Sequence, residues 1–513
     1  MHRSLPLVLL FLVMPAGTRA QAVPATAAGA GLEREVTAIL ERAGLERAHW
    51  GVHAVDAATG AVIYSRNADR LFVPASNLKL VVAAAGAHYL GPDYVWQTTL
   101  HAAGALADGE LRGNLVVRGN GDPGISGRFA DGMLDVLESW ADSLAERGIR
   151  RITGDIIADQ TLWDSQLRSP DWELYDVNWW YAAPVAPLGF NDNAIDFRVR
   201  PGAVGQPAHI TWQPAEAELV LINWTRTVPA GGDYTLDFDR VAGTDTILAF
   251  GEIPAGAAAR AEHFAVADPG RYLATVLRTI LQASGISVGG NARSVYAAPS
   301  DVASAAALFG LPAAARRESA PGGTVAEGAI GTGTPPLFTW RSKPLPETVA
   351  PILLTSQNWF AEQLLKTIGL EARGEGSFQA GLAAETEFLT RIVGIDSAAF
   401  VLRDASGLSA SNLITPRALV QLVDHIHDSD LRDVLEPGIS VSGESGSLRN
   451  RLTDLSGRVA AKTGSIRHVN SLSGVVRAQG RDIVFAILAN NTGLSGTRVA
   501  AAIDDLVRLL ARQ

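Results

Sequence analysis

The spacing of apolar positions differs from segment to segment along the chain. Near each end, segments with a helix-like period neighbour segments with a strand-like period. Residues 31–47 place their apolar side chains on one helical face, which predicts an amphipathic helix. Residues 49–69 alternate apolar and polar positions on both sides of the turn-like sequence DAATG, a pattern typical of a β-hairpin. The stretch 76–89 follows directly and predicts a second helix, with Pro74 near its start.

The C-terminal region shows a similar alternation. Three strand-like runs, 458–466, 470–479 and 481–491, precede an apolar helix predicted over 496–512. Two strands from one end of the chain and three from the other predict one five-stranded antiparallel sheet flanked by helices. The expected fold class is therefore α+β, and the two ends of the fold are expected to lie close together.

Residues 97–339 separate these two parts. They hold short strand-like runs rich in Gly and Pro, at 113–126, 151–160, 193–202, 218–228 and 234–240, and one predicted helix at 271–285. We interpret them as an inserted, mostly β region of one or two nested subdomains. The core then comprises residues 23–96 and 340–513. Within the insertion, the aperiodic run 311–336 predicts a linker or mobile loop.

Composition narrows the class and the location of the protein. The 513-residue chain has 47% hydrophobic and 19% charged residues, which is typical of a soluble globular protein. Its net charge of −10 argues against nucleic-acid binding, because phosphate contacts need a basic surface. Residues 1–22 predict a cleaved signal peptide, and no later run reaches the ~18 apolar residues of a membrane anchor. Export without cysteine fits the bacterial periplasm or the cell exterior, and we expect the periplasm.

Lysine is rare in this chain. Only four of the 43 basic residues are lysine, namely Lys79, Lys343, Lys366 and Lys462. Arginine stays protonated in proteins, whereas a buried lysine can lose its proton. A retained lysine is therefore a candidate for a position that needs a deprotonatable amine, with compositional drift as the alternative.

Ser76 and Lys79 form the single S-x-x-K sequence of the chain. Positions i and i+3 share one helical face, so the hydroxyl and the amine are expected to meet. A serine becomes a strong nucleophile when a neighbouring base takes its proton, and a lysine with a depressed pKa is such a base. Taken alone, however, S-x-x-K sequences are common in ordinary proteins.

Two further clusters follow in sequence. Ser356 and Asn358 form an S-x-N sequence before a predicted helix, for which an N-cap serine is the alternative reading, and S-x-N also occurs at 65–67. Lys462, Thr463 and Gly464 form the single K-T-G sequence, at the end of a strand-like run. There a cation and a hydroxyl can hold a carboxylate, while glycine lets a ligand approach the backbone. An ordinary strand with a tight turn is the alternative.

The order S-x-x-K, S-x-N, K-T-G is that of penicillin-binding proteins and class A β-lactamases. The sequence resembles the penicillin-interacting serine DD-peptidases, and within them the penicillin-binding protein 4-like D-alanyl-D-alanine carboxypeptidases and endopeptidases of family S13. Ser356 follows Ser76 by 280 positions, a longer gap than a β-lactamase has. The stretches that carry the resemblance are 55–80, GNGDPGIS (119–126), 179–199, SQNWFAEQLL (356–365), DASGLSASNLITP (404–416) and GSLRNRL (446–452).

This resemblance implies a β-lactamase/DD-peptidase-like fold and a set of catalytic roles. Ser76 would attack a D-Ala-D-Ala carbonyl and form an acyl-enzyme, with Lys79 as general base. Ser356 would relay a proton to the leaving amine, and Asn358 would hold the substrate amide and contact Lys79. Lys462 would bind the terminal carboxylate and help to depress the pKa of Lys79.

The resemblance also implies how the substrate is bound. Thr463 would share the carboxylate with the preceding lysine, and the residue after Gly464, Ser465, would complete an oxyanion hole with the backbone N–H of the nucleophile. In the insertion, Asp176 would bind the free amino group of a diaminopimelate-like side chain, with Tyr181 beside it. Family members often carry arginine where this chain has Ala410, which weakens the side-chain assignment.

No metal or cofactor is expected. The expected partners are peptidoglycan stem peptides, with β-lactam antibiotics as covalent inhibitors. Alternative functions on the same fold are a β-lactamase and a non-catalytic penicillin-binding receptor. Two other sites are weaker: the G-x-S-x-G match at 285–289 lies between a helix and a strand rather than between a strand and a helix, and His425 and His427 point to different faces of a predicted helix.

Overall fold

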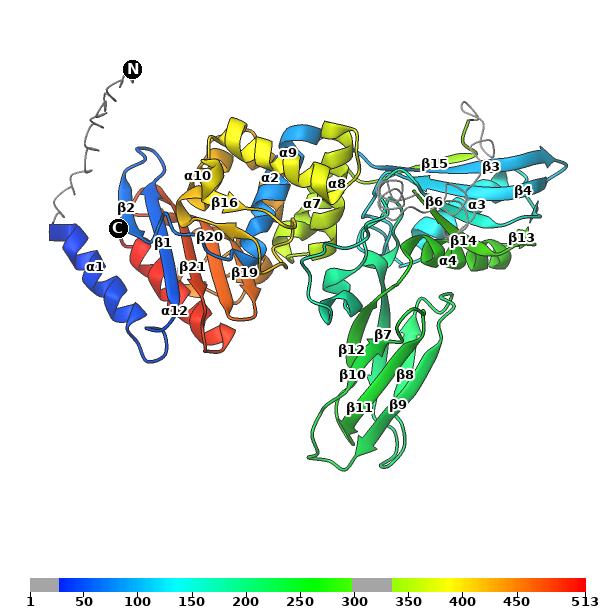
Figure 1. Cartoon of the computed structure of the whole chain (residues 1–513), viewed down its shortest axis with the longest axis horizontal. Coiled ribbons are helices and arrows are strands. Elements are labelled where there is room, and N and C mark those ends of the chain that lie inside the picture. Colours follow the sequence, from blue (N-terminus) through cyan, green and yellow to red (C-terminus); the bar gives the residue numbers. More distant parts are fainter. Residues whose placement is uncertain (1–26, 298–334) are drawn as a thin grey trace, which may run out of the picture.

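The computed structural model describes residues 27–297 and 335–513. The predicted signal peptide, residues 1–22, and the predicted linker up to residue 334 lie outside these ranges. Figure 1 shows a first body of helices around a sheet, a second body at the opposite end of the molecule, and an arm of strands that projects from the second body.

A six-stranded sheet forms the centre of the first body, with strand order β18-β19-β20-β21-β1-β2 and antiparallel pairing throughout. Its strands are β1 (His49–Asp56), β2 (Val62–Arg66), β18 (Ser440–Val441), β19 (Val459–Ile466), β20 (Val469–Ala478) and β21 (Arg481–Asn490). The α+β class is confirmed. The expected five strands become six, because β18 has only two residues and is too short to show alternation.

Helices cover both faces of this sheet (Figure 1). On one face, α1 (Ala27–Leu40) packs against α12 (Gly496–Leu510), and both share an apolar core with the strands. On the other face lie α2 (Lys79–Leu90) and α10 (Pro416–His427). The first helix ends at Leu40 rather than at the predicted residue 47. One reason is that Gly44 has a φ of 88°, which a right-handed helix does not allow.

Helix α2 is enclosed by its neighbours. It contacts α7 (Leu345–Leu354), α8 (Asn358–Arg373), α9 (Phe378–Glu387) and α11 (Leu431–Leu435). Every residue from Lys79 to Ala87 is buried as a result. None of the helices in the described ranges has the length and apolar character needed to cross a bilayer.

The second body is built on a seven-stranded mixed sheet. Its strands are β3 (Gln97–Ala107), β4 (Glu110–Gly119), β5 (Arg151–Ile152), β6 (Ile156–Gln160), β13 (Ser287–Val288), β14 (Ala292–Tyr296) and β15 (Phe338–Arg341), and the helices α3 (Asp135–Glu146) and α4 (Pro269–Ala283) belong to the same body. Gln97 of β3 pairs with Arg341 of β15. The chain therefore leaves the first body and returns to it at neighbouring points.

The arm consists of two three-stranded sheets. One contains β7 (Ala194–Arg200), β8 (His209–Gln213) and β12 (Arg260–Ala265), and the other contains β9 (Leu221–Val228), β10 (Asp237–Arg240) and β11 (Ile247–Pro254). Phe197 and Phe238 stack between the sheets with ring centroids 5.1 Å apart. A separate two-stranded sheet, β16 (Phe400–Val401) and β17 (Leu413–Ile414), flanks a loop that reaches Lys79.

Candidate active site

Ser76 lies in a single 3₁₀ turn, Ala75–Leu78, that leads directly into α2. Ala75 has a φ of 49°, a left-handed conformation that costs a residue other than glycine about 1–3 kcal/mol. Packing holds this strained backbone in place, because a side chain at Gly407 would overlap the carbonyl of Ala75. The Ser471 hydroxyl also donates to the Pro74 carbonyl at 2.6 Å. The turn that carries the serine is thus fixed from two sides.

The amine of Lys79 contacts three oxygen atoms. Its Nζ lies 2.9 Å from Ser76 Oγ, 2.7 Å from Asn358 Oδ1 and 2.6 Å from the Ser406 carbonyl oxygen. The side chain is fully buried, and this burial lowers the pKa of Lys79 to about 7, against the raising effect of the Asp404 and Glu362 carboxyl groups. Of the three contacts, only the Ser76 hydroxyl can donate a proton to the neutral amine.

Because the other two contacts are acceptors only, a neutral Lys79 keeps its two N–H bonds on Asn358 and Ser406. The lone pair of the amine must then face Ser76. The tertiary structure therefore orients the amine as a base for this hydroxyl, as the i, i+3 spacing predicted.

Ser356 does not cap a helix. Helix α8 begins at Asn358, and its N-cap residue is Gln357, which makes no side-chain capping bond. Ser356 instead has a φ of 61°, and its Oγ accepts a hydrogen bond from Lys462 Nζ at 2.9 Å. The N-cap reading of this serine is therefore wrong, and the left-handed backbone marks a position held by its surroundings.

Lys462 is the second buried lysine of the site. Besides Ser356, its Nζ donates to the Thr463 carbonyl at 2.8 Å, and no carboxylate contacts it among the described residues. Burial and the charge of Lys79 lower the pKa of Lys462 well below its usual range. The expectation that Lys462 would help to depress the pKa of Lys79 is corrected, since burial lowers that pKa and the other groups that act on it, Asp404 and Glu362, raise it.

Strand β19 runs directly beside the nucleophile. A side chain at Gly464 would overlap Ser471 Oγ and press on the backbone of Ser76, so only glycine allows this approach. Thr463 Oγ1 donates to Ser447 Oγ at 2.8 Å. Ser465 is exposed, and its Oγ accepts a hydrogen bond from Asn470 at 3.3 Å. Sequence reasoning missed Ser447, which lies in the stretch GSLRNRL.

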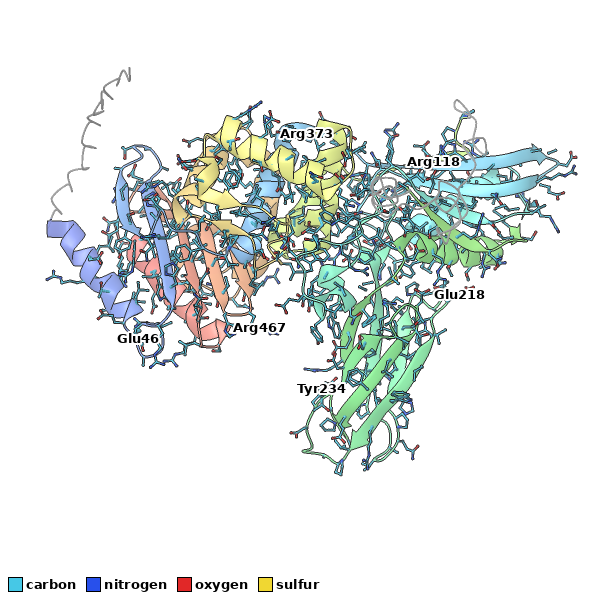
Figure 2. The ribbon with its side chains drawn as sticks, in the orientation of Figure 1. Glu46, Arg118, Glu218, Tyr234, Arg373 and Arg467 are labelled. Atoms are coloured by element: carbon cyan, nitrogen blue, oxygen red, sulfur yellow. The ribbon has the colours of Figure 1, made fainter. Side chains whose placement is uncertain are left out.

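The insertion reaches the site through Tyr181. Its backbone carbonyl accepts a hydrogen bond from Asn358 Nδ2 at 2.9 Å, and its hydroxyl donates to Asp176 Oδ1 at 3.0 Å. Burial raises the pKa of Asp176, while Arg467, just past β19, lowers it. Figure 2 shows Arg467 at the edge of the first body that faces the arm. Tyr181 thus contacts Asn358 of the S-x-N motif directly, and Asp176 is linked to it through the Tyr181 side chain.

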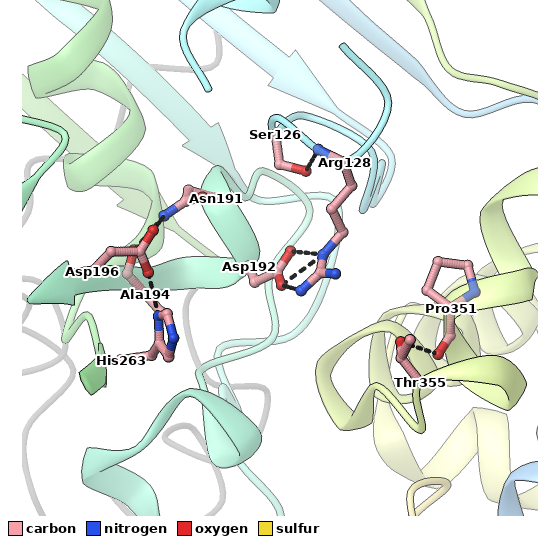
Figure 3. Close-up of polar contacts among 9 residues, drawn as sticks. All are labelled: Ser126, Arg128, Asn191, Asp192, Ala194, Asp196, His263, Pro351 and Thr355. Carbon is pink, nitrogen blue, oxygen red and sulfur yellow. Dashed lines mark hydrogen bonds and ion pairs between the residues drawn. The ribbon is translucent and has the colours of Figure 1, made fainter. Parts of the chain in front are cut away.

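A polar pocket borders the loop between Ser356 and Asn358. Its volume is about 350 Å³, and its lining includes Gln357 and two ion pairs, Arg128–Asp192 and Asp196–His263. Figure 3 shows these pairs, with the Arg128 guanidinium lying along the Asp192 carboxylate. The charges that line this pocket are therefore paired with one another.

Within residues 27–297 and 335–513, no three His, Cys, Asp or Glu side chains are grouped so that they could hold a metal ion. His427 lies on α10 and contacts Asp482 at 3.4 Å. The sequence 285–289 runs from the end of α4 into β13, so Ser287 does not lie on a nucleophile elbow. In the second S-x-N sequence, Ser65 lies on β2, and Asn67, just past that strand, donates to the Trp50 carbonyl.

Residues 32–308 and 319–513 match the model of the D-Ala-D-Ala carboxypeptidase 3 (S13) family. The chain belongs to this family. It is accordingly a serine D-Ala-D-Ala carboxypeptidase, with peptidoglycan as the substrate class. This membership agrees with the resemblance that the three motifs carry.

Relatives of this S13 peptidase cover most of its length. A D-alanyl-D-alanine carboxypeptidase from Actinomadura sp. (strain R39) is 33% identical over 494 residues, which cover 94% of this chain and 84% of that protein. The D-alanyl-D-alanine carboxypeptidase DacB of Haemophilus influenzae is 24% identical, covering 84% and 82%. The crystal structure of penicillin binding protein 4 from that organism shares the fold, with a TM-score of 0.77, 21% identity, and 93% and 99% of the chains covered.

Two buried acids beside Lys79 escaped the sequence reasoning. Glu362 and Asp404 are fully buried and lie in the stretches SQNWFAEQLL and DASGLSASN. A usable signal existed for Glu362, because it follows Asn358 by four positions on one helix and so shares its face. Another of the four lysines of the chain, Lys366, is buried on the same helix and pairs with Asp164 at 2.5 Å.

Proposed function

We propose that this S13 peptidase hydrolyses the terminal D-Ala-D-Ala bond of peptidoglycan stem peptides, and the D-Ala-diaminopimelate crosslinks between them, through an acyl-enzyme on Ser76. One observation carries the proposal: a buried lysine amine with a pKa of about 7 contacts the hydroxyl of Ser76 and keeps its other hydrogen bonds on acceptors. A base with a pKa near the working pH is suited to general base catalysis.

In acylation, neutral Lys79 takes the proton of Ser76 as Oγ bonds to the substrate carbonyl carbon. When the C–N bond breaks, the leaving amine takes a proton from Lys79 by way of the Ser356 hydroxyl, which Lys462 holds in place. Water then hydrolyses the ester, with Lys79 again accepting a proton. The enzyme returns to its starting state, and the two products are a carboxylate and an amine.

The free carboxylate of the substrate would lie between Lys462 and Thr463. Lys462 is buried beside another lysine and contacts only neutral oxygens among the described residues. A bound carboxylate would supply the missing opposite charge and favour the protonated amine. The Thr463 hydroxyl, which contacts Ser447, would add a hydrogen bond to the same group.

The backbone N–H groups of Ser76 and Ser465 are our candidates for the oxyanion hole. The close approach of Gly464 to the backbone of Ser76 supports this pairing, because it holds β19 against the turn that carries the nucleophile. Loss of one such donor typically costs about 100- to 1,000-fold in rate.

Digestion of purified muropeptides tests the proposed function. The protein should release D-alanine from monomeric pentapeptides and convert crosslinked dimers to monomers, as measured by liquid chromatography. Enzyme that was first incubated with penicillin is the control and should be inactive, because the antibiotic would occupy Ser76. Unchanged muropeptides would refute the proposal, and rapid, repeated turnover of the penicillin would identify a β-lactamase instead.

We further propose that Asp176 binds the free amino group of the stem-peptide side chain. Asp176→Asn should lower kcat/KM about tenfold for peptides with this amino group, which corresponds to about 1.4 kcal/mol, and leave N-acetylated peptides unaffected. Asp171→Asn is the matched control, since Asp171 is an exposed acid on the same segment. An equal loss with both kinds of peptide would contradict this assignment.

Export to the periplasm is the location we propose for this activity. The predicted signal peptide and the peptidoglycan substrate both support it, and stem peptides and β-lactam antibiotics are the partners we propose.

A further inference from the structure

The third contact of Lys79 is a peptide group rather than a side chain. Its amine donates to the Ser406 carbonyl at 2.6 Å, and the same peptide unit carries the N–H of Gly407. That N–H donates to Asp404 Oδ1 at 2.8 Å. A single planar peptide therefore lies between the Asp404 carboxylate and the Lys79 amine. Its carbonyl accepts from the amine, and its N–H donates to the carboxylate.

Hydrogen bonds hold Asp404 rigidly on the side of this peptide that is opposite Lys79. Its fully buried carboxylate accepts four hydrogen bonds, from Gly407 N, Ser409 N at 2.7 Å, Asn412 Nδ2 at 2.7 Å and Trp172 Nε1 at 3.0 Å. A carboxylate polarises the groups that donate to it. The Ser406 carbonyl is thus a stronger and better-fixed acceptor than an ordinary loop carbonyl.

Other ionisable groups surround the same peptide. Glu362 of α8 accepts hydrogen bonds from Ser406 N at 2.8 Å and Ala405 N at 3.2 Å, while Glu385 of α9 is buried and acts electrostatically on both acids. Burial and the neighbouring carboxylate of Asp404 raise the pKa of Glu362 to about 8. On β19, Lys462 is close enough for the charge of Lys79 to act on it.

Trp172 connects Asp404 to the part of the insertion that we propose binds the substrate. It is buried, and its indole N–H is the only donor to Asp404 that comes from outside the loop 404–412 among the described residues. The residue lies four positions before Asp176, the proposed ligand of the substrate amino group. The indole therefore links the segment 172–181 to the acid that acts on Lys79.

From this geometry we propose that Asp404 is a positioning residue for Lys79, acts through the Ser406–Gly407 peptide, and is adjusted by Trp172. The carboxylate fixes the carbonyl that directs the lone pair of the amine toward Ser76. Its negative charge also raises the pKa of Lys79 against the lowering effect of burial, and so helps to set the pH above which the amine is neutral. This inference rests on the proposed role of Lys79 as the base.

The test measures the second-order rate of acylation by a chromogenic β-lactam as a function of pH. In the unchanged protein the rate should rise with pH through about 7, because the lysine is neutral above its pKa. Asp404→Asn removes the negative charge, which lowers the pKa of Lys79, so the midpoint should move down by about one pH unit. The maximal rate should fall about 10- to 100-fold, because the amine is less well oriented.

A merely structural role for Asp404 would lower the rate at every pH without moving the midpoint. An unchanged or raised midpoint in a variant with a normal melting temperature would therefore overturn the proposal. If the unchanged protein is not acylated at all, the proposed function fails first and the inference falls with it. Acylation of the unchanged protein keeps these two failures apart.

A milder variant covers the case in which Asp404→Asn does not fold. Trp172→Phe removes one donor and leaves the charge of Asp404 less compensated, so the pKa of Lys79 should rise and the midpoint should move up by about half a pH unit. Trp163→Phe is the matched control, since Trp163 is also buried but its indole N–H has no partner among the described residues. Equal midpoints for the two variants would overturn the proposal.

Discussion

Replacement of Ser76 by alanine should abolish covalent labelling of the protein by fluorescent penicillin. The hydroxyl is the group that Lys79 contacts at 2.9 Å, and without it no acyl-enzyme can form. Loss of a catalytic serine can cost about 10⁶-fold in kcat, so hydrolysis of D-Ala-D-Ala peptides should fall below detection. The measurements are gel fluorescence after incubation with the antibiotic and release of D-alanine.

The control for this variant is Ser65→Ala. Ser65 begins the second S-x-N sequence of the chain but is exposed and lies on β2. Labelling should therefore be unchanged in Ser65→Ala. Persistent labelling of Ser76→Ala would place the nucleophile elsewhere and refute the mechanism proposed above.

Replacement of Lys79 by arginine should abolish acylation even though the positive charge is retained. Arginine cannot act as a base because it stays protonated in proteins, and its larger head group does not fit a fully buried position. General base catalysis contributes about 100- to 10,000-fold, so the acylation rate should fall by at least that factor at every pH. Stopped-flow measurement with a chromogenic β-lactam gives this rate directly.

The matched control is Lys343→Arg, which replaces another of the four lysines of the chain. Lys343 is exposed, so the β-lactam should acylate this variant at the normal rate. A melting curve separates loss of the base from loss of the fold in Lys79→Arg. Retained acylation in a folded Lys79→Arg protein would rule out Lys79 as the general base, whatever the outcome for Ser76.

The sequence was most informative where chemistry and spacing are local. Ser76 and Lys79 are three residues apart on one helical turn, so their contact follows from helix geometry alone. The sequence was less informative at Ser356, where a capping serine and a catalytic serine look alike. Only the contact with Lys462, 106 positions further along the chain, distinguishes the two.

Boundaries and short elements also escaped prediction for physical reasons. Strand β18 has two residues, and its place in the sheet depends on pairing with β19 rather than on its own pattern. The first helix stops early at a turn that ends in a left-handed glycine, although buried Leu45 continues the apolar pattern of the helix. A tertiary pairing therefore places β18, whereas a local turn ends the helix before its apolar pattern stops.

The sequence by itself determined the three motifs, the α+β class and the scarcity that singled out Lys79 and Lys462. The tertiary structure decided that Lys79 is buried, that its lone pair faces Ser76, and that Asp404 acts on it through one peptide group. The reason is physical. Motifs depend on residues that are neighbours in sequence. Burial and charge at Lys79 come from distant groups, such as Ser406 at 327 positions, which only the packed fold brings together.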